Sequence, residues 1–119
     1  MENIIDYCFY ANTDYDIANT IYKLIKHKII YIENNTWKYY ENDKWAIDKK
    51  NIKIKYILKN EVCKMFIERS IYWNKNMKYE YAEKMSCILL QIGSKLKEDK
   101  YLSNIIKECK QFFIYDESK

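Results

Sequence analysis

Lysines and a tyrosine gather in the middle of the chain, where they could contact nucleic acid. Between Lys44 and Lys64, the most basic window of the sequence, only Asp48 and Glu61 oppose the lysines. Lysine side chains neutralise backbone phosphates, and an aromatic ring among them can stack on an unpaired base. The pattern therefore predicts weak, sequence-independent contacts to DNA, made by Lys38, Tyr40, Lys44, Lys49, Lys50, Lys53 and Lys55.

The same lysines have an alternative interpretation as a solvated surface. Of the 21 basic residues only Arg69 is arginine, and abundant Ile, Asn and Tyr without proline are typical of an A/T-rich genome. A lysine excess of that origin weakens the inference from the net charge of +4 to nucleic-acid binding. For each single lysine, solvation and DNA contact both stay open.

Motifs for catalysis and metal binding are missing from the sequence. Gly93 is the single glycine, whereas phosphate-binding loops need several glycines to let the backbone approach the anion. The four cysteines form no C-x-x-C pair and His27 is the single histidine, which favours buried free thiols over a zinc or redox site. The spacing of Asp14, Asp16 and Asp48 suits helix caps and turns better than a shared ligand set. We therefore expect no catalytic residue, cofactor or metal.

A predicted sheet must position the first of these lysines. Residues 29–48 contain three runs rich in β-branched and aromatic residues, separated by Asn34-Asn35 and Asn42-Asp43. Asn and Asp tolerate left-handed backbone angles, so each break predicts a hairpin turn and the segment predicts an antiparallel meander. Period-2 alternation predicts one apolar and one mixed face. The apolar face would hold Ile30, Ile32, Trp37, Tyr39, Trp45 and Ile47, and the other Thr36, Lys38, Tyr40, Lys44 and Ala46.

Trp37, Tyr39 and Trp45 have two interpretations. They could stack on unpaired bases, at ~1–3 kcal/mol per base, or form the core of the sheet under a helix. Their predicted face is shared with isoleucines, which favours the core. In that case Trp45→Ala would cost ~3–5 kcal/mol of stability.

A helix is predicted before the sheet, over residues 13–28. Thr13 can cap it, and Asp14 and Asp16 in its first turn suit the positive end of the helix dipole. Apolar residues recur at helical spacing, so this helix is the expected cover of the apolar sheet face. Residues 1–12 are too short and mixed to assign.

After the sheet, apolar residues at spacings of three and four predict a helical part over residues 51–115. A helix over 51–70 is followed by a polar, asparagine-rich loop over 72–78. A second helix follows over about 82–96, and a last one after Asp99.

Composition and element order predict a single α+β domain over residues 1–119. A chain of 119 residues with 49% hydrophobic and 17% aromatic residues can bury a core. The fold would be a three-stranded antiparallel meander packed by about four helices. No apolar run approaches the ~20 residues of a membrane span, and the first residues lack a secretory charge pattern. We expect a soluble, intracellular protein without a membrane partner.

Three segments in this order resemble a family of replication proteins. TDYDIA at 13–18 opens the first helix, and DKWAID at 43–48 ends the hairpin. Both are similar to the domain that precedes the superfamily-3 helicase in primase–helicases of poxvirus-like and other giant DNA viruses, with phage and plasmid relatives. NIIKEC at 104–109, followed by Phe112, Phe113, Tyr115 and Asp116, resembles the final helix of that domain. The resemblance covers residues 13–117.

The chain departs from the family pattern at one pair of residues. Asp43-Lys44 stands where the family usually has His-Arg, so a contact made by that arginine is not expected here. The primase domain and the helicase with its Walker motifs, which flank this domain in the family, are not part of the sequence. The chain would then be an excised domain, a fragment of a split reading frame or a stand-alone relic.

The resemblance implies a non-catalytic accessory domain in DNA replication. It would connect primase to helicase, form part of the collar of a ring hexamer and guide DNA. Its partners would be the primase and helicase domains of the parent protein, in the host cytoplasm or at a viral replication site. The alternative is a protein-interaction or oligomerisation module without affinity for DNA.

Overall fold

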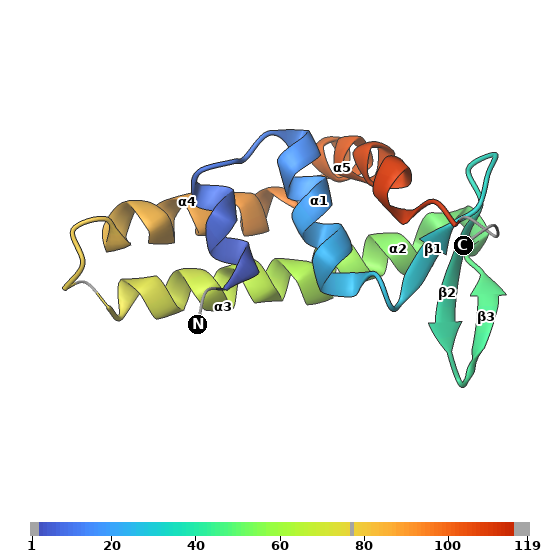
Figure 1. The fold of residues 1–119 in the computed structure, drawn as a ribbon, viewed down its shortest axis with the longest axis horizontal. Coiled ribbons are helices and arrows are strands. Elements are labelled where there is room, and N and C mark those ends of the chain that lie inside the picture. The colour runs from blue at the N-terminus through green and yellow to red at the C-terminus, as the bar shows by residue number, and fades with distance from the viewer. Residues whose placement is uncertain (1–2, 77, 116–119) are drawn as a thin grey trace.

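The predicted sheet is present as an antiparallel meander at one end of the molecule (Figure 1). The computed structural model describes residues 3–76 and 78–115, so Asp116 of the C-terminal motif lies outside the described residues. The strands β1 (Ile29–Tyr31), β2 (Trp37–Glu41) and β3 (Lys44–Ile47) pair in that order. The fold is α+β, as the sequence predicts.

Both predicted hairpin turns are confirmed. Asn34 and Asn35 have φ of 52° and 61°, and Asn42 and Asp43 have φ of 55° and 62°. Positive φ at both central residues is the requirement of a type I′ turn, whose twist matches that of the strands. The predicted turn chemistry therefore closes both hairpins.

The predicted division of the sheet into two faces is wrong. The turn between β2 and β3 has only two residues, so Tyr40 pairs directly with Trp45. In the first hairpin Ile30 pairs directly with Lys38. Directly paired residues project from the same face of a sheet. The inner face therefore carries Ile29, Tyr31, Trp37, Tyr39 and Ala46, and the outer face carries Ile30, Lys38, Tyr40, Trp45 and Ile47.

Burial follows the observed faces. Trp37 is fully buried, packs on Tyr31 and Phe113 with ring centroids 5.0 and 5.7 Å away, and anchors the inner face. Trp45 is 41% exposed, so the prediction that it forms core is wrong. Tyr39 is only partly buried. Among the described residues the buried indole N–H of Trp37 has no hydrogen-bond partner, a cost that packing of the large ring must offset.

The helix predicted before the sheet is α1 (Asp14–Ile25). Thr13 and Asp16 form a capping box, in which each side chain accepts a hydrogen bond from the other residue's backbone N–H at 3.1 and 3.2 Å. Before α1, the unassigned N-terminal segment contains the 3-10 helix η1 (Ile4–Phe9), which buries Ile5 and Cys8.

A long helical segment follows the sheet. It contains η2 (Lys49–Asn51), α2 (Ile52–Tyr56), the π-helical η3 (Ile57–Val62) and α3 (Cys63–Asn74). The predicted helix over 51–70 is thus present and continues further, so the predicted loop is wrong over residues 72–74. Trp73 explains the extension, because it is 8% exposed and its indole N–H donates to Asp6 of η1 at 2.9 Å.

The π-helical turn keeps one face of this segment buried. Ile54, Leu58, Val62 and Phe66 are fully buried at a constant spacing of four residues. In a straight α-helix that spacing drifts by ~40° per step, because each residue turns ~100°. The wider π turn offsets the drift, since it has more residues per turn.

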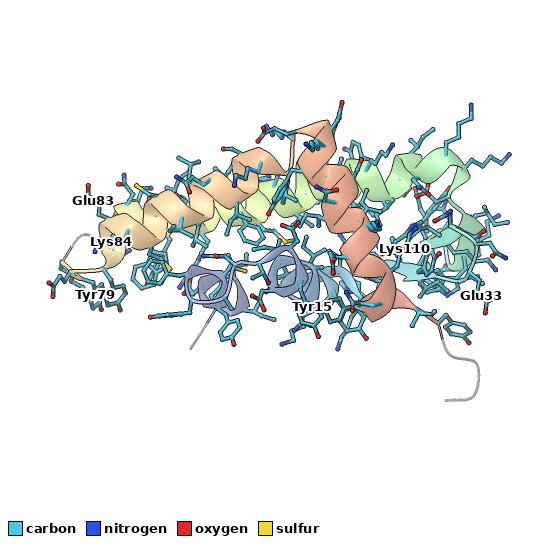
Figure 2. All side chains as sticks on the ribbon, turned by 90° about the horizontal axis from the view of Figure 1, so that it is seen from above. Tyr15, Glu33, Tyr79, Glu83, Lys84 and Lys110 are labelled. Carbon is cyan, nitrogen blue, oxygen red and sulfur yellow. The ribbon has the colours of Figure 1, made fainter. Side chains whose placement is uncertain are left out.

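Two further helices complete the fold, α4 (Ala82–Lys95) and α5 (Asp99–Phe113). α3 and α4 form an antiparallel hairpin, with η1 and α1 lying across it and α5 beside α1 (Figure 1). The molecule measures 47 × 30 × 27 Å, and Figure 2 shows Tyr79 at the hairpin end, remote from Glu33 and Lys110 at the sheet end. In the described part of the chain, no helix is both long and apolar enough to span a bilayer.

Candidate nucleic-acid interface

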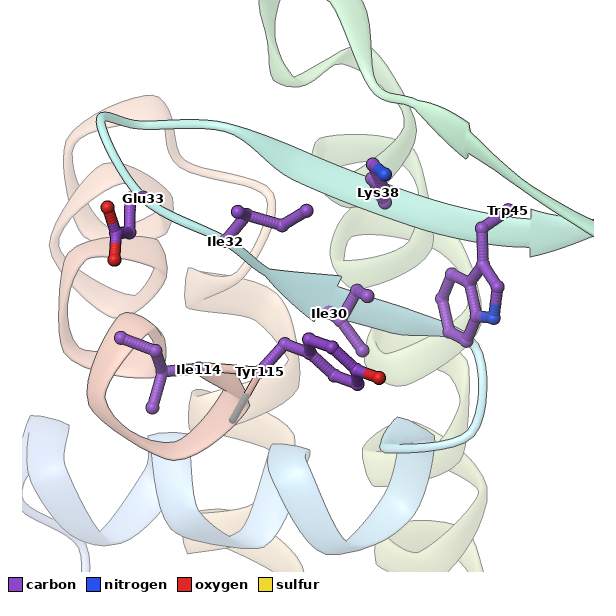
Figure 3. Close-up of a pocket in the computed structure, with 7 residues that line it drawn as sticks. All are labelled: Ile30, Ile32, Glu33, Lys38, Trp45, Ile114 and Tyr115. Carbon is purple, nitrogen blue, oxygen red and sulfur yellow. The ribbon is translucent and has the colours of Figure 1, made fainter. Parts of the chain in front are cut away.

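The outer face of the sheet forms a hollow in which residues from all three strands meet. β1 contributes Ile30, β2 contributes Lys38 and β3 contributes Trp45. Figure 3 shows the ring of Tyr115 beneath Ile30, with Trp45 and Glu33 at opposite ends of the hollow. We call this surface the outer-face hollow; its lining is Ile30, Ile32, Glu33, Lys38, Trp45, Ile114 and Tyr115.

The segment after α5 completes the outer-face hollow. Ile114 forms a parallel bridge with Tyr31, and the backbone N–H of Tyr115 donates to the carbonyl of Tyr31 at 2.8 Å. The C-terminal motif and the sheet, remote in the sequence, thereby form one surface. Ile114 and Tyr115 are both 53% exposed.

Aromatic side chains on the outer face are accessible. Tyr40 is 46% exposed, and its ring lies edge-on to Trp45 with centroids 5.2 Å apart. Such a pair holds the rings in a preferred geometry while part of each stays in contact with solvent. An unpaired base could therefore stack on the indole.

The outer-face hollow carries one lysine and one carboxylate, Lys38 and Glu33. Within residues 3–76 and 78–115, Lys38 has no ion-pair partner. Its ammonium group is therefore available for a phosphate, while Glu33 lies at the far end from Trp45 (Figure 3).

Lys44 and Lys53 belong to the other side of the β2–β3 ribbon. Lys44 pairs directly with Glu41 at the hairpin turn, away from the face of Tyr40. The Lys53 ammonium lies 3.0 Å from the Glu41 carboxylate and 5.3 Å from the centre of the Tyr39 ring. The hydrogen bond with Glu41 raises the pKa of Lys53. Lys53 is therefore partly committed to contacts within the protein.

Lys49 and Lys50 are exposed at the start of the long helical segment. Asp48 fixes this start, because its carboxylate accepts the backbone N–H groups of Lys53 at 2.7 Å and Ile54 at 2.9 Å. This is the capping role that the sequence predicts for Asp48.

Lys55 is an exposed residue of α2. The Lys59 ammonium lies 3.0 Å from Asp99, and that hydrogen bond, with Lys55 as a weaker influence, lowers the pKa of the Asp99 carboxyl. The seven predicted DNA-contact residues thus divide into three groups: Lys38 and Tyr40 on the outer face, Lys44, Lys49, Lys50 and Lys53 around the hairpin and helix start, and Lys55 towards α5.

Sequence reasoning considered base stacking by Trp45 but favoured a core role for it. It gave no binding role to the other apolar members of the outer-face hollow, which are Ile30, Ile32, Ile114 and Tyr115. The signal for Trp45 was available, because a two-residue turn makes Trp45 the partner of Tyr40. No comparable local signal places Ile114 and Tyr115 beside β1, since their bridge spans most of the chain.

The cysteines show no reactive arrangement in the described residues. Cys8, Cys63 and Cys109 are buried free thiols, as predicted, whereas Cys87 is exposed. Burial raises the pKa of Cys8 and Cys109, which keeps both thiols protonated. Among residues 3–76 and 78–115, no three His, Cys, Asp or Glu side chains gather as a metal site.

Asp6, Arg69 and Trp73 form the most connected polar cluster. The Arg69 guanidinium donates to both Asp6 oxygens at 2.7 and 2.8 Å, and Asp6 also accepts from Trp73. The centre of the Tyr72 ring lies 4.0 Å from Cζ of Arg69, within cation–π distance. The carboxylate is fully engaged, so this cluster ties η1 to α3.

The sequence matches no protein-family model and has no significant match among curated proteins.

Proposed function

We propose that this chain is a non-catalytic accessory domain of a viral-type primase–helicase that contacts single-stranded DNA through the outer face of its sheet. The resemblance of the first helix, the hairpin and the C-terminal segment to the domain preceding the helicase supports the replication role. Its partners would be the primase and helicase domains of the parent protein, which forms a ring.

One observation carries the DNA contact: Trp45 and Tyr40 are exposed on the same face as Lys38. Tyrosine and tryptophan are enriched in binding interfaces relative to the rest of protein surfaces. An unpaired base can stack on the indole while Lys38 neutralises a nearby phosphate. Paired bases in a duplex do not offer that stacking face, which favours a single strand.

A fluorescence anisotropy titration with labelled oligo-dT tests the proposal. The wild-type chain should bind with a Kd of ~10⁻⁴–10⁻⁶ M, the scale of non-specific binding. Trp45→Ala should weaken binding by about tenfold, since stacking contributes ~1–3 kcal/mol per base. Lys38→Gln should reduce the slope of log K against log salt by ~0.7, the contribution of one phosphate on a single strand.

The matched control is Leu90→Ala. Leu90 is 47% exposed, similar to Trp45, and belongs to α4, a helix that lies away from the sheet (Figure 1). Leu90→Ala should leave the affinity for oligo-dT unchanged. Absence of binding at low salt, or equal loss in the Leu90 and Trp45 variants, contradicts the DNA contact.

The outer-face hollow also supports a second function, assembly without DNA affinity. Ile30, Ile32 and Ile114 supply an apolar lining on which a neighbouring domain or subunit could pack. Sedimentation of the chain over a range of concentrations distinguishes the two functions. Self-association that Trp45→Ala abolishes, without oligo-dT binding, would favour assembly.

A further inference from the structure

A second hollow lies where β3 ends and the long helical segment begins, and it shares no lining residue with the outer-face hollow. Three large apolar side chains around it are exposed: Ile47 by 58%, Ile52 by 65% and Tyr56 by 55%. We propose that this helix-start hollow binds an acidic, amphipathic segment of a partner protein. The proposal goes beyond the DNA contact and uses a different hollow, which adjoins the outer face of the sheet at Ile47.

The apolar side chains come from two elements. Ile47 is the last residue of β3, and Ile52 and Tyr56 belong to α2. Ile52 and Tyr56 are four residues apart, so they lie one above the other on a single helix face. Tyr39 also lines the hollow. A partner's apolar side chains could pack among these four.

The charges around the helix-start hollow favour an acidic partner. Lys49 and Lys53 line it, and Lys50 is exposed next to Lys49. Asp48 also lines the hollow, but it is only 7% exposed and its carboxylate accepts the backbone N–H groups of Lys53 and Ile54. Among the residues described, Lys49 and Lys50 have no ion-pair partner. Their ammonium groups can therefore meet partner carboxylates.

The apolar side chains favour protein over nucleic acid. Bases stack on aromatic rings, and two of the three exposed side chains, Ile47 and Ile52, offer no such ring. A second copy of this chain is also disfavoured, because the net charge is +4 and the hollow itself is basic. Asp or Glu alternating with Leu, Ile or Phe complements both the lysines and the apolar anchors.

Selection from a displayed library of random peptides on the whole chain tests this inference. The selected peptides should combine acidic with large apolar residues, and their affinity should fall as salt increases. The double variant Ile52→Ser/Tyr56→Ser should bind them about tenfold more weakly or worse, as expected for central interface residues. Lys49→Gln should reduce the salt dependence.

Leu90→Ser is the matched control, since Leu90 is an exposed apolar residue of α4 and should not affect peptide binding. Circular dichroism should show that all variants remain folded, because the substituted side chains are exposed.

Four outcomes would overturn the inference. The selected peptides could lack an acidic bias, or the double variant could bind them as tightly as the wild type. The double variant could also lose oligo-dT affinity as Trp45→Ala does, which would assign the hollow to nucleic acid. Finally, self-association lost in the double variant would identify a second copy as the occupant. Peptide binding without any oligo-dT binding would overturn only the proposed function.

Discussion

Trp37 and Trp45 project from opposite faces of one sheet and have different roles. Trp37 is fully buried between Tyr31 and Phe113, whereas Trp45 contacts solvent beside Tyr40. The first ring holds the sheet on α5, and the second leaves a stacking surface open. Stability and binding therefore depend on different tryptophans.

This division predicts different costs of substitution. Trp37→Ala should lower the free energy of unfolding by ~3–5 kcal/mol, because it empties a large core site. Trp45→Ala should cost about 1 kcal/mol or less, mainly the lost edge-on contact with Tyr40. Urea unfolding of both variants measures the difference. Equal losses would place Trp45 in the core and remove it from the binding surface.

Tyr101 should make the folded state less stable at alkaline pH. Burial is the main cause that raises its pKa from 10.0 to about 12. The unfolded chain loses this proton first, so the stability that Tyr101 contributes is fully present below pH 10.0 and is lost as the pH rises towards 12. The raised thiol pKa values of Cys8 and Cys109 act in the same direction.

Tyr101→Phe should therefore make the fall of the urea midpoint above pH 10 less steep than in the wild type. The midpoints are compared across this pH range, and the variant retains the contributions of Cys8, Cys109 and Lys53, whose pKa values are also raised. An identical slope in both proteins would show that the Tyr101 hydroxyl is not held neutral by burial.

At the scale of elements, local chemistry predicted most of the fold. Asn34-Asn35 and Asn42-Asp43 fixed the two turns, and the Thr13–Asp16 capping box fixed the start of α1, because each depends on neighbouring residues. The prediction of which residues share a sheet face was wrong, because the number of residues in the turn decides which residues of the two strands pair. The predicted end of the helix at residue 70 was also wrong. The contact of Trp73 with Asp6 extends α3, and this contact joins residues that are remote in the sequence.

The α3–α4 hairpin depends on Gly93. A Cβ at this position would lie 3.2 Å from Cβ of Phe66 and from Cγ1 of Ile67, and 3.3 Å from the carbonyl oxygen of Cys63. Gly93→Ala gains ~1 kcal/mol of helix propensity but crowds the core at a cost of ~1–3 kcal/mol. We expect a net loss of about 1 kcal/mol in urea unfolding.

Ser94→Ala is the control for that substitution, because Ser94 is an exposed neighbour on the same helix. It should be neutral or slightly stabilising, since alanine favours helix without a new contact. A Gly93→Ala protein more stable than the wild type would show that α3 and α4 can move apart at little cost.

At the scale of the whole molecule, the candidate DNA surface lies at the sheet end, and the α3–α4 turn lies at the other (Figure 1). The seven residues predicted from sequence did not converge on one surface. Lys38 and Tyr40 share the outer face of the sheet. Lys44 projects from the opposite face, because it pairs directly with Glu41. Lys49, Lys50, Lys53 and Lys55 lie on η2 and α2 rather than on the sheet. Spacing in the sequence cannot predict this division, because it depends on how the sheet and helices pack.

The most direct test maps oligo-dT onto the isotope-labelled chain by NMR, following backbone amide shifts during a titration at low salt. We expect the largest changes at Ile30, Lys38, Tyr40 and Trp45, with little change at Leu90. Changes centred on the α3–α4 hairpin, or no changes at any residue, would contradict the claim that the outer face of the sheet contacts single-stranded DNA.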